Sequence, residues 1–202
     1  MQLKNTRERF GAIAGIYHWL IASAFILSYP FVYYVVLVLE RDRTNPLFLP
    51  VLNVHWFLGI LVGVLVIPRL IWRWVSVEPE AAPGSRVEHL LAKLAHWGLY
   101  ALMIIMPATG YLGTGGSTSA TIDLYLFKIP RFPNTELFQI LQIDWVTFEP
   151  IMDGIHHFSG KWIAPVVVLL HIAAAFYHHF IRRDTVLVRM LPERVGEWLL
   201  RK

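Results

Sequence analysis

The chain has 202 residues, of which 56% are hydrophobic and 16% are charged, and its formal net charge is +4. A mean hydropathy of +0.51 is typical of a membrane protein and argues against a water-soluble domain. The absence of cysteine excludes disulfides, thiolate zinc sites, iron–sulfur clusters and covalent haem attachment through a C-x-x-C-H motif.

Four long segments contain no Asp, Glu, Lys or Arg: residues 10–39, 44–68, 94–122 and 162–181. An apolar helix of about 20 residues crosses a hydrocarbon core of about 30 Å, so each segment is long enough to span a membrane. The first segment is too long for the h-region of a signal peptide, and we expect it to remain uncleaved. We therefore predict an all-α membrane protein in which one domain, residues 1–202, forms a four-transmembrane-helix bundle. The expected spans cover residues 11–39, 50–74, 92–113 and 158–182, with a long outer loop over 114–157.

Basic residues gather in three of the regions that flank these spans. Thirteen of the 18 Lys and Arg lie in the N-terminal segment, the second connection and the C-terminal tail, and five lie in the other two connections. Cytoplasmic segments of membrane proteins carry an excess of Lys and Arg. The distribution therefore predicts that both termini are cytoplasmic.

Two histidines, His171 and His178, lie seven residues apart in the last span, so their rings project from one face of a helix. Ring nitrogens are costly to leave unpaired in hydrocarbon. In the predicted orientation His18 lies near the cytoplasmic end of the first span, and His55 lies near the outer end of the second. Depth in the membrane therefore pairs His18 with His178 and His55 with His171.

Two histidines without a carboxylate or thiolate make a poor zinc site, but they suit the axial positions of a b-type haem. We predict two haem b groups in the bundle, since bundle cores are a usual place for such cofactors. His18 and His178 would hold the inner haem iron, and His55 and His171 would hold the outer one. The alternative for each histidine is a hydrogen-bonded interior ring or a member of a proton relay.

Further polar residues near the span ends are candidates for binding the cofactor. We expect His96 to bond a haem propionate or to line a quinone site, and we expect Arg69, Arg73 and Lys93 to neutralise propionates. The alternative interpretation of each of these cations is that it only sets the orientation of the helices, or that its side chain extends to the membrane surface without binding a cofactor. At the outer side, Lys161, His157 and His156 are the candidates for a catalytic entrance.

The segment from His157 to Pro192 has the pattern H-x13-H-x6-H-H, followed by Arg182-Arg183-Asp184. It resembles the last helix and tail of the prokaryotic cytochrome b561 family. Matches in the other three spans extend the resemblance over the whole membrane region: Tyr17-His18-Trp19-Leu20, Asn53-Val54-His55, Ala95-His96 and Met106-Pro107.

The resemblance implies a four-helix di-haem protein of the bacterial inner membrane that transfers electrons. Within the family the chain is most similar to the superoxide oxidase type, which takes electrons from superoxide outside and delivers them to ubiquinone. Matching positions would carry the haem ligands at His18, His55, His171 and His178, the same four that depth in the membrane selects.

The charge of the outer segment bears on the electron donor. Residues 113–161 have a net charge of −2 with His neutral, whereas an anionic reductant prefers a positive entrance. A local patch of Lys161, His156 and His157 would still guide superoxide. The acidic balance suits a basic protein donor equally well.

Two further functions stay open at this point. In one alternative, the chain is a haem-bearing membrane anchor that passes electrons between a partner dehydrogenase, hydrogenase or cytochrome c and the quinone pool. In the other, it is a transporter that uses its histidines as a proton relay and binds no coloured cofactor.

Overall fold

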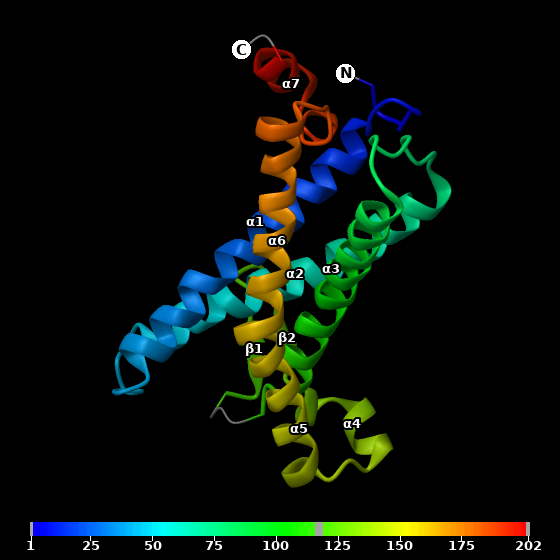
Figure 1. The fold of residues 1–202 in the computed structure, drawn as a ribbon. Helices are drawn as coiled ribbons and strands as arrows, with labels where there is room; N and C mark the ends of the chain where they lie inside the picture. The colour runs from blue at the N-terminus through cyan, green and yellow to red at the C-terminus, as the bar shows by residue number, and fades with distance from the viewer. Residues whose placement is uncertain (1, 116–118, 201–202) are drawn as a thin grey trace. The chain divides into compact units, whose positions relative to one another are not determined.

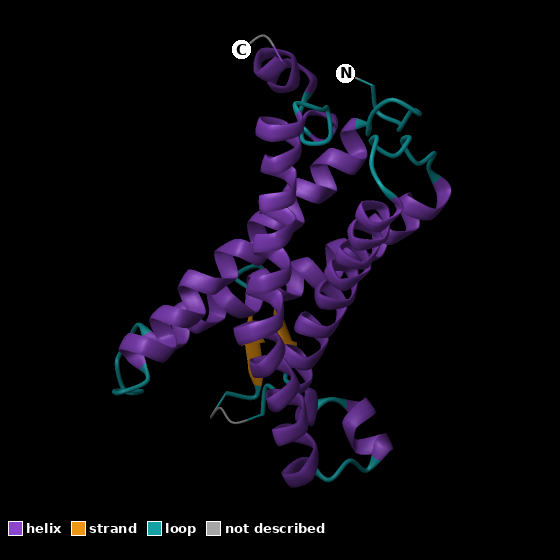
Figure 2. Ribbon diagram, in the orientation of Figure 1, coloured by secondary structure: helices purple, strands orange, loops and turns teal. Residues whose placement is uncertain are grey.

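The computed structural model describes residues 2–115 and 119–200, and helices make up most of them (Figure 2). The long helices are α1 (Ala12–Tyr34), α2 (Phe48–Val75) and α3 (Arg86–Leu112), which are labelled in Figure 1. A π turn, η1 (Val35–Leu39), extends α1. The last long helix is built from α5 (Trp145–Phe158), the π turn η3 (Ser159–Ile163), α6 (Ala164–Phe176) and the π turn η4 (Tyr177–Arg182).

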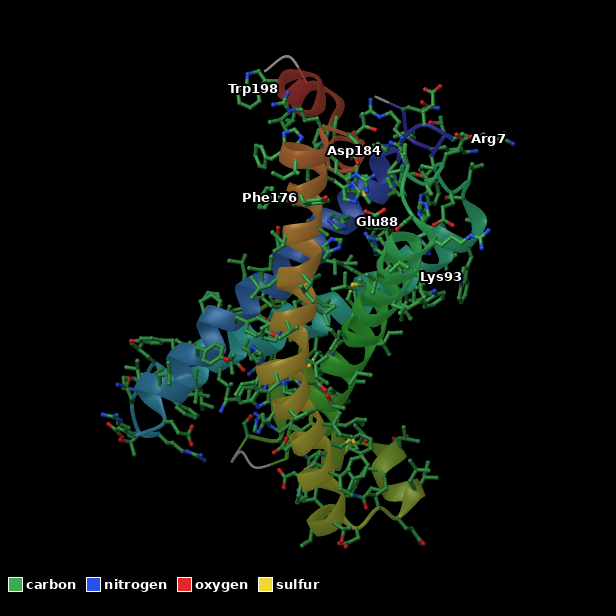
Figure 3. All side chains as sticks on the ribbon, in the orientation of Figure 1. Arg7, Glu88, Lys93, Phe176, Asp184 and Trp198 are labelled. Carbon is green, nitrogen blue, oxygen red and sulfur yellow. The ribbon has the colours of Figure 1, made fainter. Side chains whose placement is uncertain are left out.

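Four of these helical stretches are long and apolar enough to cross a membrane, as the sequence predicted: Ala12–Leu39, Phe48–Val75, Arg86–Leu112 and Trp145–Arg182. Many of their large apolar side chains face outward. Val64 and Ile67 are each 60% exposed, and Phe176 projects away from the helices around it (Figure 3). Exposure of this kind along whole helices is what a protein surface in contact with lipid requires.

The fourth stretch begins earlier than the sequence predicted. We expected a span from about residue 158, but the helix is continuous from Trp145. The prediction followed the charge-free run, whereas a helix does not have to end where the apolar surroundings end. At about 1.5 Å per residue, a helix of 38 residues is about 57 Å long and exceeds a core of about 30 Å. Part of the predicted outer loop is therefore helical.

The rest of the outer segment contains a small antiparallel hairpin of β1 (Thr121–Asp123) and β2 (Lys128–Pro130), drawn in orange in Figure 2. Ile122 pairs with Ile129 in its register, and Ile122 is buried. A 3-10 turn, η2 (Phe132–Asn134), follows, and then the short helix α4 (Glu136–Leu141). The hydroxyl of Thr135 accepts a hydrogen bond from the Phe138 amide, which caps α4.

Contacts divide the chain into two compact units. Unit 1 comprises Met1–Leu20, Leu65–Leu102 and Trp162–Lys202, and unit 2 comprises Ile21–Val64 and Met103–Lys161. Each unit is described by itself below. Each contains ends of all four membrane-spanning stretches, so each has its own set of histidines.

In unit 1 the C-terminal tail folds back onto the first helix. It contains the 3-10 turn η5 (Val188–Met190) and the helix α7 (Glu193–Leu200). The indole of Trp19 donates a hydrogen bond of 3.0 Å to the carbonyl of Met190. Arg182 at the end of η4 forms an ion pair of 2.7 Å with Glu88 in the first turn of α3. These contacts fix the histidine-bearing helices at their ends.

Candidate functional site

Unit 2 encloses a cavity of about 390 Å³ between residues of α1, α2, α3 and the α5–η3 helix. Ligand pockets commonly have volumes of about 300–1,000 Å³ and apolar walls with a few polar groups. Most of the walls are aromatic and aliphatic. The residues that matter most for its chemistry are His55, Gly59, Gly110, His156, His157 and Lys161.

Two histidines of this cavity face each other at a distance that suits one metal ion between them. The ring centroids of His55 and His156 are 6.2 Å apart, and the ring planes are inclined by 85°. Two metal–imidazole bonds of about 2 Å on opposite sides of one ion give a similar centroid separation, roughly 6 Å. The pair therefore fits the axial ligands of a haem iron.

Backbone carbonyls fix the orientation of both rings. His55 Nδ1 lies 3.0 Å from the carbonyl oxygen of Ser28, and His156 Nδ1 lies 3.0 Å from that of Met106. A carbonyl oxygen only accepts, so Nδ1 carries the proton in each ring, and Nε2 keeps its lone pair. Metal-bound histidines are held in this way, with one nitrogen bonded to the protein and the other to the metal.

Glycines give the cavity room for a flat ligand. A Cβ built at Gly59 would meet no atom within 4 Å, so this part of the α2 backbone is open to the cavity. Gly110, in contrast, is closely packed, because a Cβ there would lie 2.8 Å from the ring of His156. A side chain at Gly110 would push His156 out of its position opposite His55.

The three residues predicted at an outer entrance all line this cavity. His156 is one of the facing pair, and the ring of His157 lies 6.1 Å from it. Lys161, on the next turn after His157, adds an ammonium group to the same wall. Lys161 therefore brings a positive charge to the side of the cavity that carries the two imidazoles.

Unit 1 contains a second cluster of histidines, formed by His18 on α1, His96 on α3 and His171 on α6. The ring centroids of His18 and His171 are 6.1 Å apart, and those of His96 and His171 are 5.7 Å apart. The separation of His18 and His171 is close to that of the facing pair in unit 2. The separation alone allows a second pair of ligands, but Arg69 donates to Nδ1 of His18, so ligation through Nε2 requires that contact to be given up.

Cations surround the cluster of unit 1. Arg69 Nη2 lies 3.3 Å from His18 Nδ1, and the guanidinium groups of Arg69 and Arg73 lie 5.8 and 5.7 Å from the ring centroid of Tyr100. In the described part of the chain, Arg69 Nε and Trp72 Nε1 are buried and lack a hydrogen-bond partner. Buried donors without partners are rare in native proteins, so this site fits a ligand with acidic oxygens, such as haem propionates.

His178 contacts Asp184 and has no ring contact with the three histidines of this cluster among the described residues. Its Nδ1 is 2.5 Å from Oδ2 of Asp184, which follows the end of η4 and is labelled in Figure 3. Burial raises the pKa of the Asp184 carboxyl, but hydrogen bonds from His178 and the Val186 amide outweigh it, and the pKa is below its usual value. Lys93, a predicted propionate partner, is exposed on α3 (Figure 3).

The arrangement differs from the predicted pairing in both units. The structure brings His18 beside His171 and His55 beside His156, whereas depth in the membrane had paired them with His178 and His171. The depth argument placed the outer end of the last span near residue 158, but the helix is continuous from Trp145, so His156 already lies within it and beside His55. The π turns at Ser159–Ile163 and Tyr177–Arg182 also rotate the residues beyond them, and such turns are frequent at functional sites.

Four membrane-spanning helices with paired histidines in their interior are typical of a membrane-bound b-type cytochrome. The family model for prokaryotic cytochrome b561 matches residues 9–193, and the chain therefore belongs to this family. Its members are electron-transfer proteins with b-type haem and redox partners that include membrane quinones. The chain is accordingly a multi-pass protein of the bacterial inner membrane.

Curated relatives include two proteins of Escherichia coli (strain K12). The chain is 29% identical to cytochrome b561 homolog 2 over 199 residues, which cover 98% of this chain and 99% of that protein. It is 27% identical to cytochrome b561 homolog 1, over 69% of this chain and 74% of the relative. A protein of Yersinia pestis named probable superoxide oxidase CybB is 27% identical, over 71% of this chain and 76% of the relative.

The open backbone at Gly59 gives a direct test of haem binding in the cavity of unit 2. We expect Gly59→Leu to fill the cavity with a branched side chain and to lower the haem content of the purified protein. Gly154→Leu is the matched control, because a Cβ there also meets nothing within 4 Å but Gly154 is exposed on α5. Haem is measured per chain as the pyridine haemochrome; equal haem in both variants contradicts the assignment.

Proposed function

We propose that the chain is a di-haem cytochrome b that carries electrons across the inner membrane. His55 and His156 would hold an outer haem, and His18 and His171 an inner haem. The observation that carries the proposal is a pair of histidines from two different helices in each compact unit, with ring centroids 6.1 Å apart for His18 and His171 and 6.2 Å apart for His55 and His156. A haem with two axial imidazoles supplies a one-electron carrier without an open position for oxygen.

The proposal changes two of the ligand assignments made from the sequence. His171 becomes an inner ligand, and His156 takes its place at the outer site. His178, bonded to Asp184, becomes available for proton transfer near the cytoplasmic side. The positive-inside distribution of Lys and Arg supports this orientation, with both termini in the cytoplasm.

Superoxide is the electron donor that we propose, and ubiquinone is the acceptor. Two superoxide ions each lose one electron and become O2, while one quinone gains the two electrons and two protons and becomes quinol. Lys161 and His157 would attract the anion to the outer cavity, which they line. The name of the Yersinia relative supports this donor.

On the inner side the basic residues would position the acceptor and the propionates. Arg69 and Arg73 would pair with propionates, and His96 would do the same or hydrogen-bond a quinone carbonyl. His178 and Asp184 form a short hydrogen-bonded pair that would supply the protons for quinol formation. His178 lies in the last turns of the last span and Asp184 follows it, a position that would suit uptake from the cytoplasm.

A protein donor is the second candidate, and the acidic outer segment favours it. Residues 113–161 have a net charge of −2, which would attract a basic redox protein such as a cytochrome c. The chain would then act as a membrane anchor in a larger electron-transfer complex, with the same haems and without substrate chemistry of its own.

The histidine doublet on α5 tests the outer ligand. We expect His156→Ala to lower the haem content from two per chain to one, because it removes the ring opposite His55. His157→Ala should keep two haems and react more slowly with superoxide. The two variants are compared by haem content and reduced-minus-oxidised spectra; loss of a haem in His157→Ala but not in His156→Ala would reverse the assignment.

A second comparison separates the two candidates for the inner ligand. We expect His171→Ala to lose one haem, and we expect His178→Ala to keep both and to reduce quinone more slowly because proton delivery is impaired. Haem content and low-spin absorption bands are the measurements. A His178→Ala variant with a single haem would restore the pairing predicted from depth in the membrane.

The donor is tested with the purified protein and no partner subunit. Superoxide generated by xanthine oxidase should reduce the haems and, with a ubiquinone analogue present, yield quinol and O2; superoxide dismutase should abolish the reaction. Haems that stay oxidised under superoxide but are reduced by a protein donor would favour the anchor function instead.

A further inference from the structure

Arg131 is a charged residue in an unusual environment. It follows β2 in the outer segment, and only 2% of its surface is exposed. Its Nε donates a hydrogen bond of 2.7 Å to the carbonyl of Ser119, and its Nη1 lies 3.4 Å from that of Thr114. Burial lowers the pKa of its guanidinium, but arginine stays protonated in proteins. A full positive charge is therefore held inside unit 2.

No carboxylate of the described residues forms an ion pair with this guanidinium. Its partners are backbone carbonyls and the ring of Trp56, whose centroid lies 4.5 Å from the guanidinium carbon. The attraction of a cation to an indole face is smaller than the usual cost of burying a charge without a counter-ion. A residue kept at such a cost calls for a reason beyond packing.

The charge lies directly behind one wall of the outer cavity. Trp56 and Thr114, which contact the guanidinium, both line that cavity, and so does Ile122 of the hairpin. Arg131 itself is not among the lining residues, so it does not occupy the space of a ligand. In a region of low dielectric constant a charge acts over a longer distance than it does in water.

Three of the five acidic residues of the outer segment, Asp123, Glu136 and Asp144, have side chains that reach solvent, whereas Glu149 and Asp153 are half-buried and Asp153 interacts with His157 at the cavity wall. Asp123 lies 3.9 Å from Lys128, and both side chains are largely exposed. Asp144 accepts a hydrogen bond from Thr147 at an exposed position, and Glu136 is also exposed. Exposed charges are screened by salt within about 10 Å, whereas a buried charge is screened much less. The net charge of −2 is therefore a poor guide to the field inside the cavity.

We propose that the buried charge of Arg131 makes the outer cavity electropositive. Its field reaches the cavity across Trp56; there it would raise the reduction potential of the haem held by His55 and His156 and would favour an anionic reductant. The inference rests on the proposed function. It also explains how a segment with an acidic net charge can receive superoxide.

The experiment is a redox titration of the complete protein in detergent or nanodiscs. The outer haem is identified as the component that His55→Ala lacks. We expect Arg131→Gln to shift its midpoint potential to a more negative value and to lower the rate constant with superoxide several-fold, with two haems retained. Arg131→Lys should keep the wild-type potential, because it keeps the charge.

A second pair of variants leaves Arg131 in place in case its removal prevents folding. Ser119→Asp adds a carboxylate to the residue whose carbonyl accepts from the guanidinium and should lower the same potential, whereas Ser119→Asn should not. An unchanged potential in Arg131→Gln or in Ser119→Asp would overturn the proposal. Equal shifts in Arg131→Gln and Arg131→Lys would also overturn it, because hydrogen bonding would then matter and not charge. Failure of the proposed function is distinct, since the wild type would then hold fewer than two haems.

Discussion

The structure depends on one constraint: an imidazole inside a membrane needs a partner for each ring nitrogen. In unit 2 the carbonyls of Ser28 and Met106 bind Nδ1 of His55 and His156. The Nε2 atoms remain, and an iron ion between the rings would satisfy both. The glycine backbone at Gly59 and the apolar walls follow from the same need, because they leave space for the porphyrin that carries the iron.

The distribution of charge follows from this arrangement. Most of the Lys and Arg lie in the N-terminal segment, the second connection and the C-terminal tail, and Arg69 and Arg73 bring part of this charge to the histidines of unit 1. Residues 113–161 have an acidic net charge, but Lys161 lies in the wall of the cavity and Arg131 is buried behind it. The positions of the charged side chains around such a cavity therefore matter more for the choice of reductant than the net charge of the segment.

The sequence predicted much of the fold, because charge-free runs located four spans. The haem ligands stay a prediction, although His18, His55 and His171 do lie in clusters of histidines. The position of His156 beside His55 was not predictable, because the charge-free run placed the start of the last span near residue 158, whereas the helix begins at Trp145. The burial of Arg131 was also out of reach, since it depends on contacts with Trp56, far away in the chain.

The central claim is that each compact unit holds one haem between two histidines. The most direct test is the reduced-minus-oxidised absorption spectrum of the purified protein, with haem quantified per chain and electron paramagnetic resonance of the oxidised form. The account predicts two b-type haems per chain, both low-spin with two axial imidazoles. A single haem, or a high-spin signal from an iron with an open position, would contradict it.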